Sequence, residues 1–159
     1  MTPLLTSLEN LTKDRGAMAA LRKALIPEQR QGCFKYLPRL GCRFESEPEV
    51  LRFSIIAHFW GHYPQHSDTA GNLGQSMRAI ANGDMGHPFN KRFERLIAAD
   101  SLEELAAQLK GVLSLLKSAS ASIDFDRLAS DLFWFERNPS QLKREWCGGF
   151  YVERPEVTS

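Results

Sequence analysis

The sequence lacks the features that mark several classes of protein. Its cysteines number only three, Cys33, Cys42 and Cys147, an odd count without CxxC spacing that argues against a disulfide framework or a zinc ribbon. No apolar run approaches the roughly eighteen residues that span a bilayer, and the N-terminus has no basic segment followed by a secretory cleavage site. We therefore expect a cytoplasmic protein that has reduced thiols and does not contact a membrane.

Catalytic motifs are also missing. The sequence contains neither the GxSxG turn of a serine hydrolase nor the GxxxxGK[ST] phosphate loop. Gly71-Asn72-Leu73-Gly74 has no lysine and no strand before it, and Cys147 is more typical of a small buried residue than of a nucleophile. We therefore predict that the protein is not an enzyme and binds no cofactor.

Three histidines, His58, His62 and His66, suggest a metal site. His58 and His62 lie four residues apart on one predicted helix, but Pro64 ends that helix before His66, and no HExxH motif is present. Helical histidines at this spacing are more often packed or solvated than ligating. We predict no metal. An enzyme that uses the three histidines remains an alternative, and metal analysis of the purified protein would test it.

Helix signals, by contrast, recur along the whole chain. Ser101 and Glu104 form a capping box ahead of a leucine stripe, Asp124 is placed to cap the next helix, and Asn138-Pro139 begins another. Nothing indicates a strand hairpin. The sequence therefore predicts an all-α helical bundle of about eight or nine helices, whose earlier members cover residues 4–13, 16–25 and an almost wholly apolar segment at 47–62.

Two breaks divide this pattern. Residues 64–72 are the best loop candidate, and Gly83–Gly86 forms a second break. We place a boundary between two lobes at the second break, which gives an N-terminal helical lobe at 1–85 and a C-terminal helical lobe at 86–159 of a single compact protein. The last helix is expected to end near Gly148-Gly149.

Charge is nearly balanced overall but unevenly distributed. The formal net charge is +1, yet residues 13–43 carry eight Lys and Arg against two acidic residues, a net charge of +6. Residues 96–136 carry three basic and seven acidic residues, a net charge of −4. Such segregation can create a local positive field that a polyanion would feel. A solvated helix face explains the same pattern equally well.

Several basic residues fall on helix faces opposite the apolar residues. In the helix that begins at Pro88, the apolar stripe faces one side and Lys91, Arg92 and Arg95 face the other. Arg15 and Arg22 share a side with a small residue between them, where two guanidinium groups could bind phosphate oxygens. Arg78 lies just beside an apolar stripe. Each residue alone could be a solubilising charge, but their repetition favours contact with a nucleic-acid backbone.

Three stretches together resemble a known family. They are 15–23 (RGAMAALRK), 72–80 (NLGQSMRAI) and 93–100 (FERLIAAD), followed by a leucine-rich helix, a helix around Asp126-Arg127-Leu128 and an ending in Trp146 and Phe150-Tyr151. Their order and spacing resemble the CasB family, the small subunit of the type I-E CRISPR Cascade complex. The similarity extends over residues 13–151.

The resemblance implies a function that the residues alone do not establish. It implies an all-helical, non-catalytic subunit whose partners are the guide-bearing backbone subunits, the large subunit and a second copy of itself. It also implies contact with guide RNA and target DNA, with the displaced DNA strand and the guide–target heteroduplex held so that the R-loop persists. The family's basic positions correspond here to Arg22, Lys23, Arg78, Lys91 and Arg92. Gln75 departs from the family pattern, and a helical protein–protein adaptor without nucleic-acid binding remains the alternative.

Overall fold

The computed structural model describes residues 1–81 and 87–152, and this part of the chain is entirely helical in its regular structure. It contains nine α-helices and one short 3₁₀ helix and no strand, so the predicted all-α class and helix number are confirmed. The helices are α1 (Pro3–Thr12), α2 (Arg15–Arg22), α3 (Gln31–Phe34), η1 (Leu37–Leu40), α4 (Glu47–His62), α5 (Leu73–Ala81), α6 (Pro88–Ile97), α7 (Leu102–Ser118), α8 (Phe125–Arg137) and α9 (Pro139–Tyr151).

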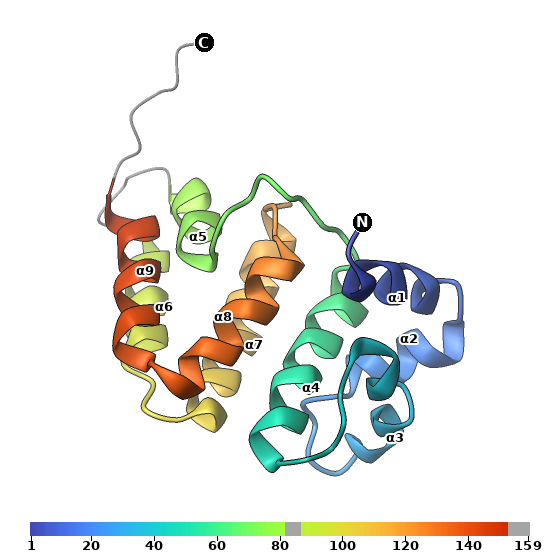
Figure 1. Ribbon diagram of the computed structural model, residues 1–159. Coiled ribbons are helices and arrows are strands. Elements are labelled where there is room, and N and C mark those ends of the chain that lie inside the picture. The colour runs from blue at the N-terminus through green and yellow to red at the C-terminus, as the bar shows by residue number, and fades with distance from the viewer. Residues whose placement is uncertain (82–86, 153–159) are drawn as a thin grey trace.

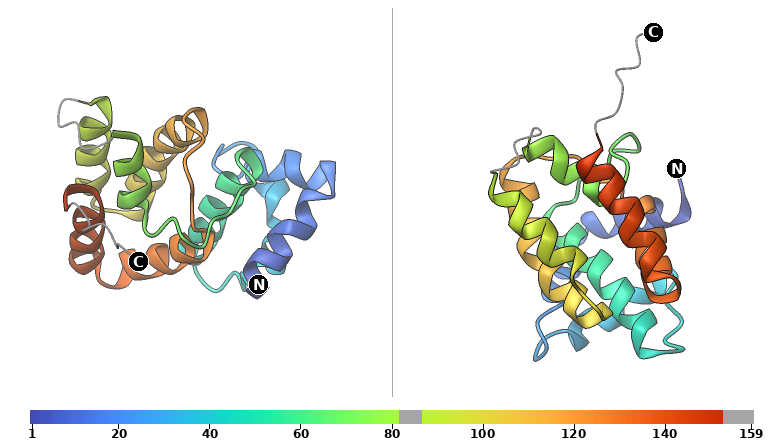
Figure 2. Two further views of the ribbon diagram at one scale, coloured as in Figure 1. Left: turned by 90° about the horizontal axis from the view of Figure 1, so that it is seen from above. Right: turned by 90° about the vertical axis from the view of Figure 1, so that its left-hand side faces the viewer.

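Helix α4 lies at the centre of the molecule. It packs against α2, α7, α8 and η1, and every residue from Ser54 to Gly61 is buried. This agrees with its sequence, because a helix that is apolar all round must be enclosed by other elements. Figure 1 shows α1 to α4 on one side of the molecule and α5 to α9 on the other, and the left view of Figure 2 agrees with this arrangement.

Side-chain caps fix where the helices begin. The side chains of Ser101, Asp124 and Asn138 accept hydrogen bonds from the first-turn amides of α7, α8 and α9, as the sequence predicts. The capping box differs in one detail: the Glu104 carboxylate accepts the amide N–H of Asp100, at 2.8 Å, rather than that of Ser101. These caps satisfy amides that the helices cannot pair internally.

The contact between α5 and α9 explains why the predicted end of the last helix is wrong. Helix α9 does not end near Gly148-Gly149 but continues to Tyr151. A Cβ atom at Gly149 would collide with the Asn72 side chain, and one at Gly74 would collide with the Trp146 carbonyl oxygen. Both glycines therefore permit close approach of two helices, and the resulting packing offsets the helix-breaking tendency of glycine.

The division into two predicted lobes is only partly within the described residues. The predicted boundary at residue 85 and the Gly83–Gly86 break lie outside the described residues, so this division stays a prediction. Helix α5 belongs to the predicted N-terminal lobe, yet it packs against α9 and α6. In the part of the chain that the structure describes, no helix is long and apolar enough to cross a membrane.

Candidate nucleic-acid interface

Helix α2 and its C-cap carry three of the predicted contacts, Arg15, Arg22 and Lys23, and all three are exposed. Asp14 caps the start of α2 through the amide of Ala17, which brings Arg15 into the first turn. Lys23 follows the last turn. The inward face of α2 buries Ala17, Met18 and Leu21.

Arg22 is more constrained than its sequence suggests. Its Nε atom donates a hydrogen bond to the carbonyl oxygen of Gly61 in α4, at 2.9 Å. The two helices approach closely here, because a Cβ atom at Gly61 would lie only 2.7 Å from the Arg22 backbone nitrogen. The guanidinium is thus oriented by α4 before any ligand binds, which lowers the entropy cost of using it.

Of the three cations predicted to face outward from α6, two do so. Lys91 and Arg95 are exposed and lie one turn apart, on the side opposite the buried Phe93. Arg92 is half-buried and lies against α7, because a Cβ atom at Gly111 would be 2.5 Å from its Nη1 atom. The absence of a side chain at Gly111 makes room for Arg92, a tertiary contact that helix periodicity cannot reveal.

Arg78 already has a structural partner. It is half-buried, and its Nη1 atom donates to the carbonyl oxygen of Phe150 at 2.8 Å. Phe150 is in the last turn of α9, where carbonyl groups have no partner within the helix. Arg78 therefore stabilises the end of α9, and any contact with a ligand would have to share the guanidinium.

Within the described residues, none of the seven predicted cations has a carboxylate partner. Among residues 1–81 and 87–152, ion pairs of up to 4.0 Å involve other basic residues, such as Arg52, Arg127, Arg137 and Lys143. The predicted residues do not form one cluster, since α2 lies on the opposite side of the molecule from α5 and α6 (Figure 1). Their charge is nevertheless available to an external anion.

The structure adds a cationic groove that the sequence analysis missed. A groove of about 410 Å³ lies between α4 and α7. Its polar lining consists of His58, His62, Lys110, Ser114, Lys117 and Ser118, with no carboxylate among the residues that line it. Lys110 and Lys117 are seven apart on one side of α7, a spacing the sequence shows, but they lie in a segment of net negative charge.

The electrostatics of this groove act on its histidines. Burial, followed by neighbouring His62 and Lys110, lowers the pKa of His58 from 6.5 to about 4. Burial also lowers the pKa of His62, and Lys117 and Arg22 contribute to the same direction. Both rings are therefore neutral at pH 7 in the free protein.

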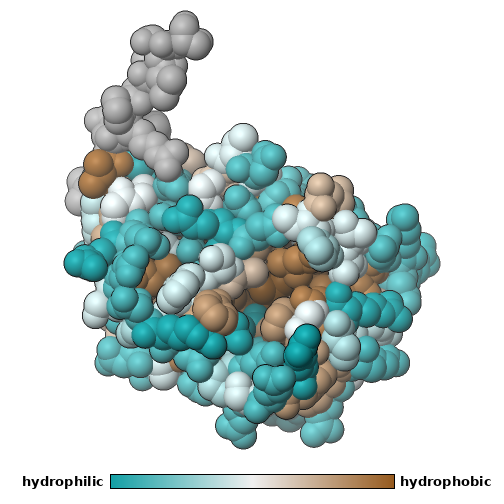
Figure 3. Space-filling view, viewed as in Figure 1, coloured by the Kyte–Doolittle hydropathy of each residue, from teal (hydrophilic) through white to brown (hydrophobic). Residues whose placement is uncertain are grey.

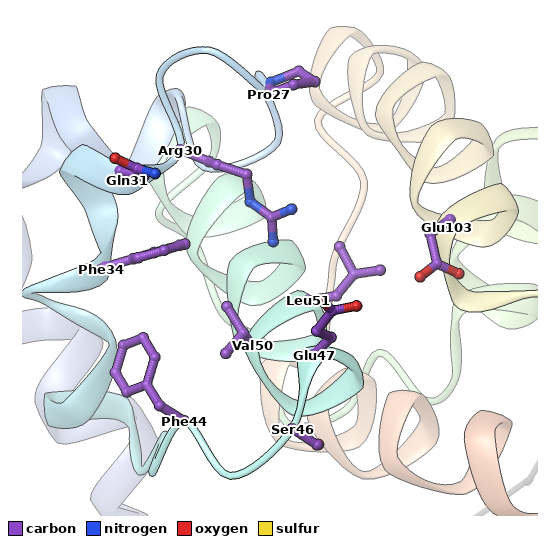
Figure 4. A pocket seen from close by; sticks show the side chains of 10 residues that line it. All are labelled: Pro27, Arg30, Gln31, Phe34, Phe44, Ser46, Glu47, Val50, Leu51 and Glu103. Atoms are coloured by element: carbon purple, nitrogen blue, oxygen red, sulfur yellow. The ribbon is translucent and has the colours of Figure 1, made fainter.

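A second recess has the wrong charge for a polyanion. It has a volume of about 630 Å³, and Arg30 extends into it while Glu47 and Glu103 stand on its other walls (Figure 4). The remaining wall is largely apolar, with Pro27, Phe34, Phe44, Val50 and Leu51. One cation against two carboxylates makes this recess acidic, so the groove between α4 and α7 is the better anion site.

The three histidines do not converge on one point. His58 and His62 are neighbours, with ring centroids 4.5 Å apart. His66 instead accepts the Phe125 amide and lies near Asp124 and Asp126, with one ligand atom of each within 4.8 Å of the others. Asp124 caps α8, and Asp126 accepts from the Thr2 hydroxyl at 2.7 Å. These bonds tie the N-terminus and the 63–72 segment to the start of α8.

The distribution of polar and apolar residues over the surface completes the description of the site. On the face in Figure 3, hydrophilic residues predominate and hydrophobic residues gather in a hollow near its middle. The exposed large apolar side chains in the described residues include Phe44, Trp134 and Tyr151. Together these features define a small helical protein whose cations lie on exposed helix faces and in one groove.

Comparison with known proteins identifies the family. The model of the CRISPR-associated protein Cse2 family matches residues 17–151, and the chain belongs to this family. This confirms the resemblance to the CasB family. No curated protein matches the chain in sequence.

Two solved structures share the fold. They are CasB from Thermus thermophilus, with a TM-score of 0.77, and a CRISPR-associated protein of the Cse2 family from the same species, with a TM-score of 0.78. Each is 23% identical to this chain, and each match covers 96% of this chain and 100% of the other.

Proposed function

We propose that this protein is a non-catalytic subunit of a type I-E CRISPR Cascade complex and that it holds nucleic-acid backbone to stabilise the R-loop. Membership in the Cse2 family supports the role in Cascade. The observation that carries the nucleic-acid role is the set of exposed cations without carboxylate partners in the described residues, Arg15, Lys23, Lys91 and Arg95, together with the acid-free groove between α4 and α7.

Weak backbone contacts are sufficient for this role. Forming an R-loop exchanges one duplex for another of similar stability, so a few contacts decide whether the open state persists. Contacts to phosphate carry no sequence information, which leaves the reading of sequence to base pairing. Assembly into a complex raises the effective concentration, so low intrinsic affinity is enough.

The partners follow from the same proposal. The protein would contact the guide-bearing backbone subunits, the large subunit and a second copy of itself, and through them guide RNA and target DNA. The complex would act in the cytoplasm, where invading DNA is encountered. Arg22, Arg78 and Arg92 would contribute charge from fixed positions, because each is held by α4, α9 or α7.

The test compares R-loop lifetimes in the assembled complex. Replacing both Lys91 and Arg95 by alanine should shorten the R-loop lifetime several-fold. It should also reduce the slope of log affinity against log salt concentration by the amount expected for about one to two lost phosphate contacts. The control replaces Lys143 and Arg144 of α9 by alanine, which removes the same charge from another helix. An unchanged lifetime in the α6 variant would overturn the assignment to α6.

A complex without this subunit tests the function as a whole. Its R-loops should decay faster than those of the complete complex at the same salt concentration. If the subunit assembles normally but never changes R-loop lifetime or nucleic-acid retention, the adaptor alternative is correct.

A further inference from the structure

The backbone carbonyl of Arg22 fixes the state of both groove histidines. It lies 3.3 Å from His58 Nδ1 and 3.2 Å from His62 Nε2. A carbonyl oxygen can only accept, so each of these nitrogens must carry a hydrogen. In the neutral rings, His58 Nε2 and His62 Nδ1 then carry no hydrogen and can only accept hydrogen bonds. They become donors only when the rings are protonated.

The surroundings of the groove decide when that happens. Lys110 and Lys117 face the rings from α7, and Arg22 faces them from α2. Protonation of a ring in the empty groove would therefore add a charge beside existing cations. A bound anion reverses this balance, because it neutralises the lysines and favours a third positive charge.

Among the described residues, the other elements packed on α4 supply no opposing charge to the rings. Glu136 of α8 pairs with Arg52 in the first half of α4, at 3.6 Å. Arg39 of η1 lies over the Tyr36 ring, 5.6 Å from its centroid. Neither is among the charges that act on His58 or His62.

We propose that the groove between α4 and α7 binds a backbone phosphate of nucleic acid and that His62 takes up a proton as the phosphate enters. Lys110 and Lys117 supply the permanent charge. Ser114 and Ser118 line the same wall, but their hydroxyls already donate to the carbonyl oxygens of Lys110 and Ser114 within α7, at 3.4 and 2.9 Å. His62 is the less buried of the two rings, so it is the one that charges, while His58 stays neutral and holds the Arg22 carbonyl. Nucleic-acid binding then strengthens as the pH falls. This inference rests on the proposed function, whose ligand it shares.

The experiment measures the affinity of the full chain for single-stranded oligo(dT) between pH 7.5 and 5.5 at constant ionic strength. Thymine has no group that titrates in this range, so the protein supplies any pH dependence. The wild-type affinity should rise as the pH falls, by at most about tenfold per pH unit for one proton. Calorimetry in buffers of different ionisation enthalpy should detect up to one proton taken up on binding.

Four variants localise the effect. His62→Gln keeps an N–H donor for the Arg22 carbonyl but cannot be protonated, so its affinity should not change with pH. His66→Gln removes a histidine outside the groove and should retain the wild-type pH dependence. Lys117→Gln should weaken binding several-fold at every pH, whereas Lys143→Gln on α9 should not.

The outcomes separate this inference from the proposed function. Binding that is independent of pH, or equally dependent on pH in His62→Gln, overturns proton uptake by His62. Binding unaffected by Lys110→Gln and Lys117→Gln overturns the phosphate site, while salt-sensitive retention would leave the proposed function standing. If the wild-type chain binds oligo(dT) at no pH and does not alter R-loop lifetime in the complex, both proposals fail.

Discussion

A hydrogen bond between Arg22 and Gly61 joins α2 to the central helix α4. The Arg22 Nε atom donates to the Gly61 carbonyl at 2.9 Å, and the Arg22 carbonyl accepts from His58 and His62 of the same helix. One residue of α2 is thus bound by three residues of α4. This junction fixes a predicted phosphate contact and also sets the protonation chemistry of the neighbouring groove.

The glycine at this junction should be intolerant of a side chain. Gly61→Ala places a Cβ atom 2.7 Å from the Arg22 nitrogen and 2.9 Å from the Leu21 carbonyl carbon. Since these are backbone atoms, the helices must separate, and the free energy of unfolding should fall by about 1–3 kcal/mol. Urea unfolding measures this, with Gly148→Ala as the control: nothing lies within 4 Å of its Cβ position, so alanine should leave stability unchanged or raise it by about 0.5–1 kcal/mol. Equal losses in both variants would contradict the steric explanation.

The stability of the protein should depend on the protonation of His58. Its folded pKa is about 4, below its ordinary value of 6.5, mainly because of burial. The unfolded chain therefore binds a proton in this range that the folded chain does not. Stability is complete above about pH 6.5 and falls as the pH drops towards 4, by up to about 3 kcal/mol.

The variant His58→Asn isolates this contribution. The asparagine amide occupies the position of His58 Nδ1, so it can still donate to the Arg22 carbonyl, but it cannot titrate. The difference in unfolding free energy between wild type and variant, measured in urea at pH 7.5, 6 and 5, should narrow or change sign as the pH falls. A difference that is constant with pH would show that His58 does not resist protonation.

Arg78 allows a structural role to be separated from a nucleic-acid role. Arg78→Ala removes the 2.8 Å bond to the Phe150 carbonyl, which should cost about 1.5 kcal/mol and increase amide exchange in the last turn of α9. Arg78→Lys keeps the charge but loses the guanidinium geometry. If Arg78 also contacts phosphate, lysine should restore oligonucleotide binding better than it restores stability. Stability that both variants leave unchanged would mean that the bond to Phe150 contributes nothing.

Asp131 joins α8 to α9 and should be sensitive to the loss of its oxygens. It is buried and accepts from Trp146 Nε1 at 2.9 Å and from Arg127 Nε at 3.2 Å, while burial raises its pKa. Asp131→Ala leaves a buried indole N–H without an acceptor and should lower stability by about 1–3 kcal/mol. Asp131→Asn, which keeps one acceptor, should lose less. Thermal unfolding followed by tryptophan fluorescence compares them, and Asp68→Ala at an exposed loop position should match the wild type.

Much of the fold could be predicted because it depends on local signals. The caps at Ser101, Asp124 and Asn138, and the apolar segment at 47–62, act over a few residues and survive in the structure. The end of α9 could not be predicted in this way. Glycine weakens a helix locally, and only contact with α5 shows why Gly149 is tolerated inside one.

In the candidate site, too, local sequence signals determined some features and tertiary packing determined others. The sequence by itself determined that the chain is helical and carries cations on helix faces, because hydrophobic period and charge placement are local properties. Only the tertiary structure decided that Arg22, Arg78 and Arg92 are held by partners while Lys91 and Arg95 are free of them in the described residues. It also brought His58 and His62 opposite Lys110 and Lys117, which lie 48 to 59 positions further along the chain. The packing of α4 against α7 thus creates a cationic groove that no single segment contains.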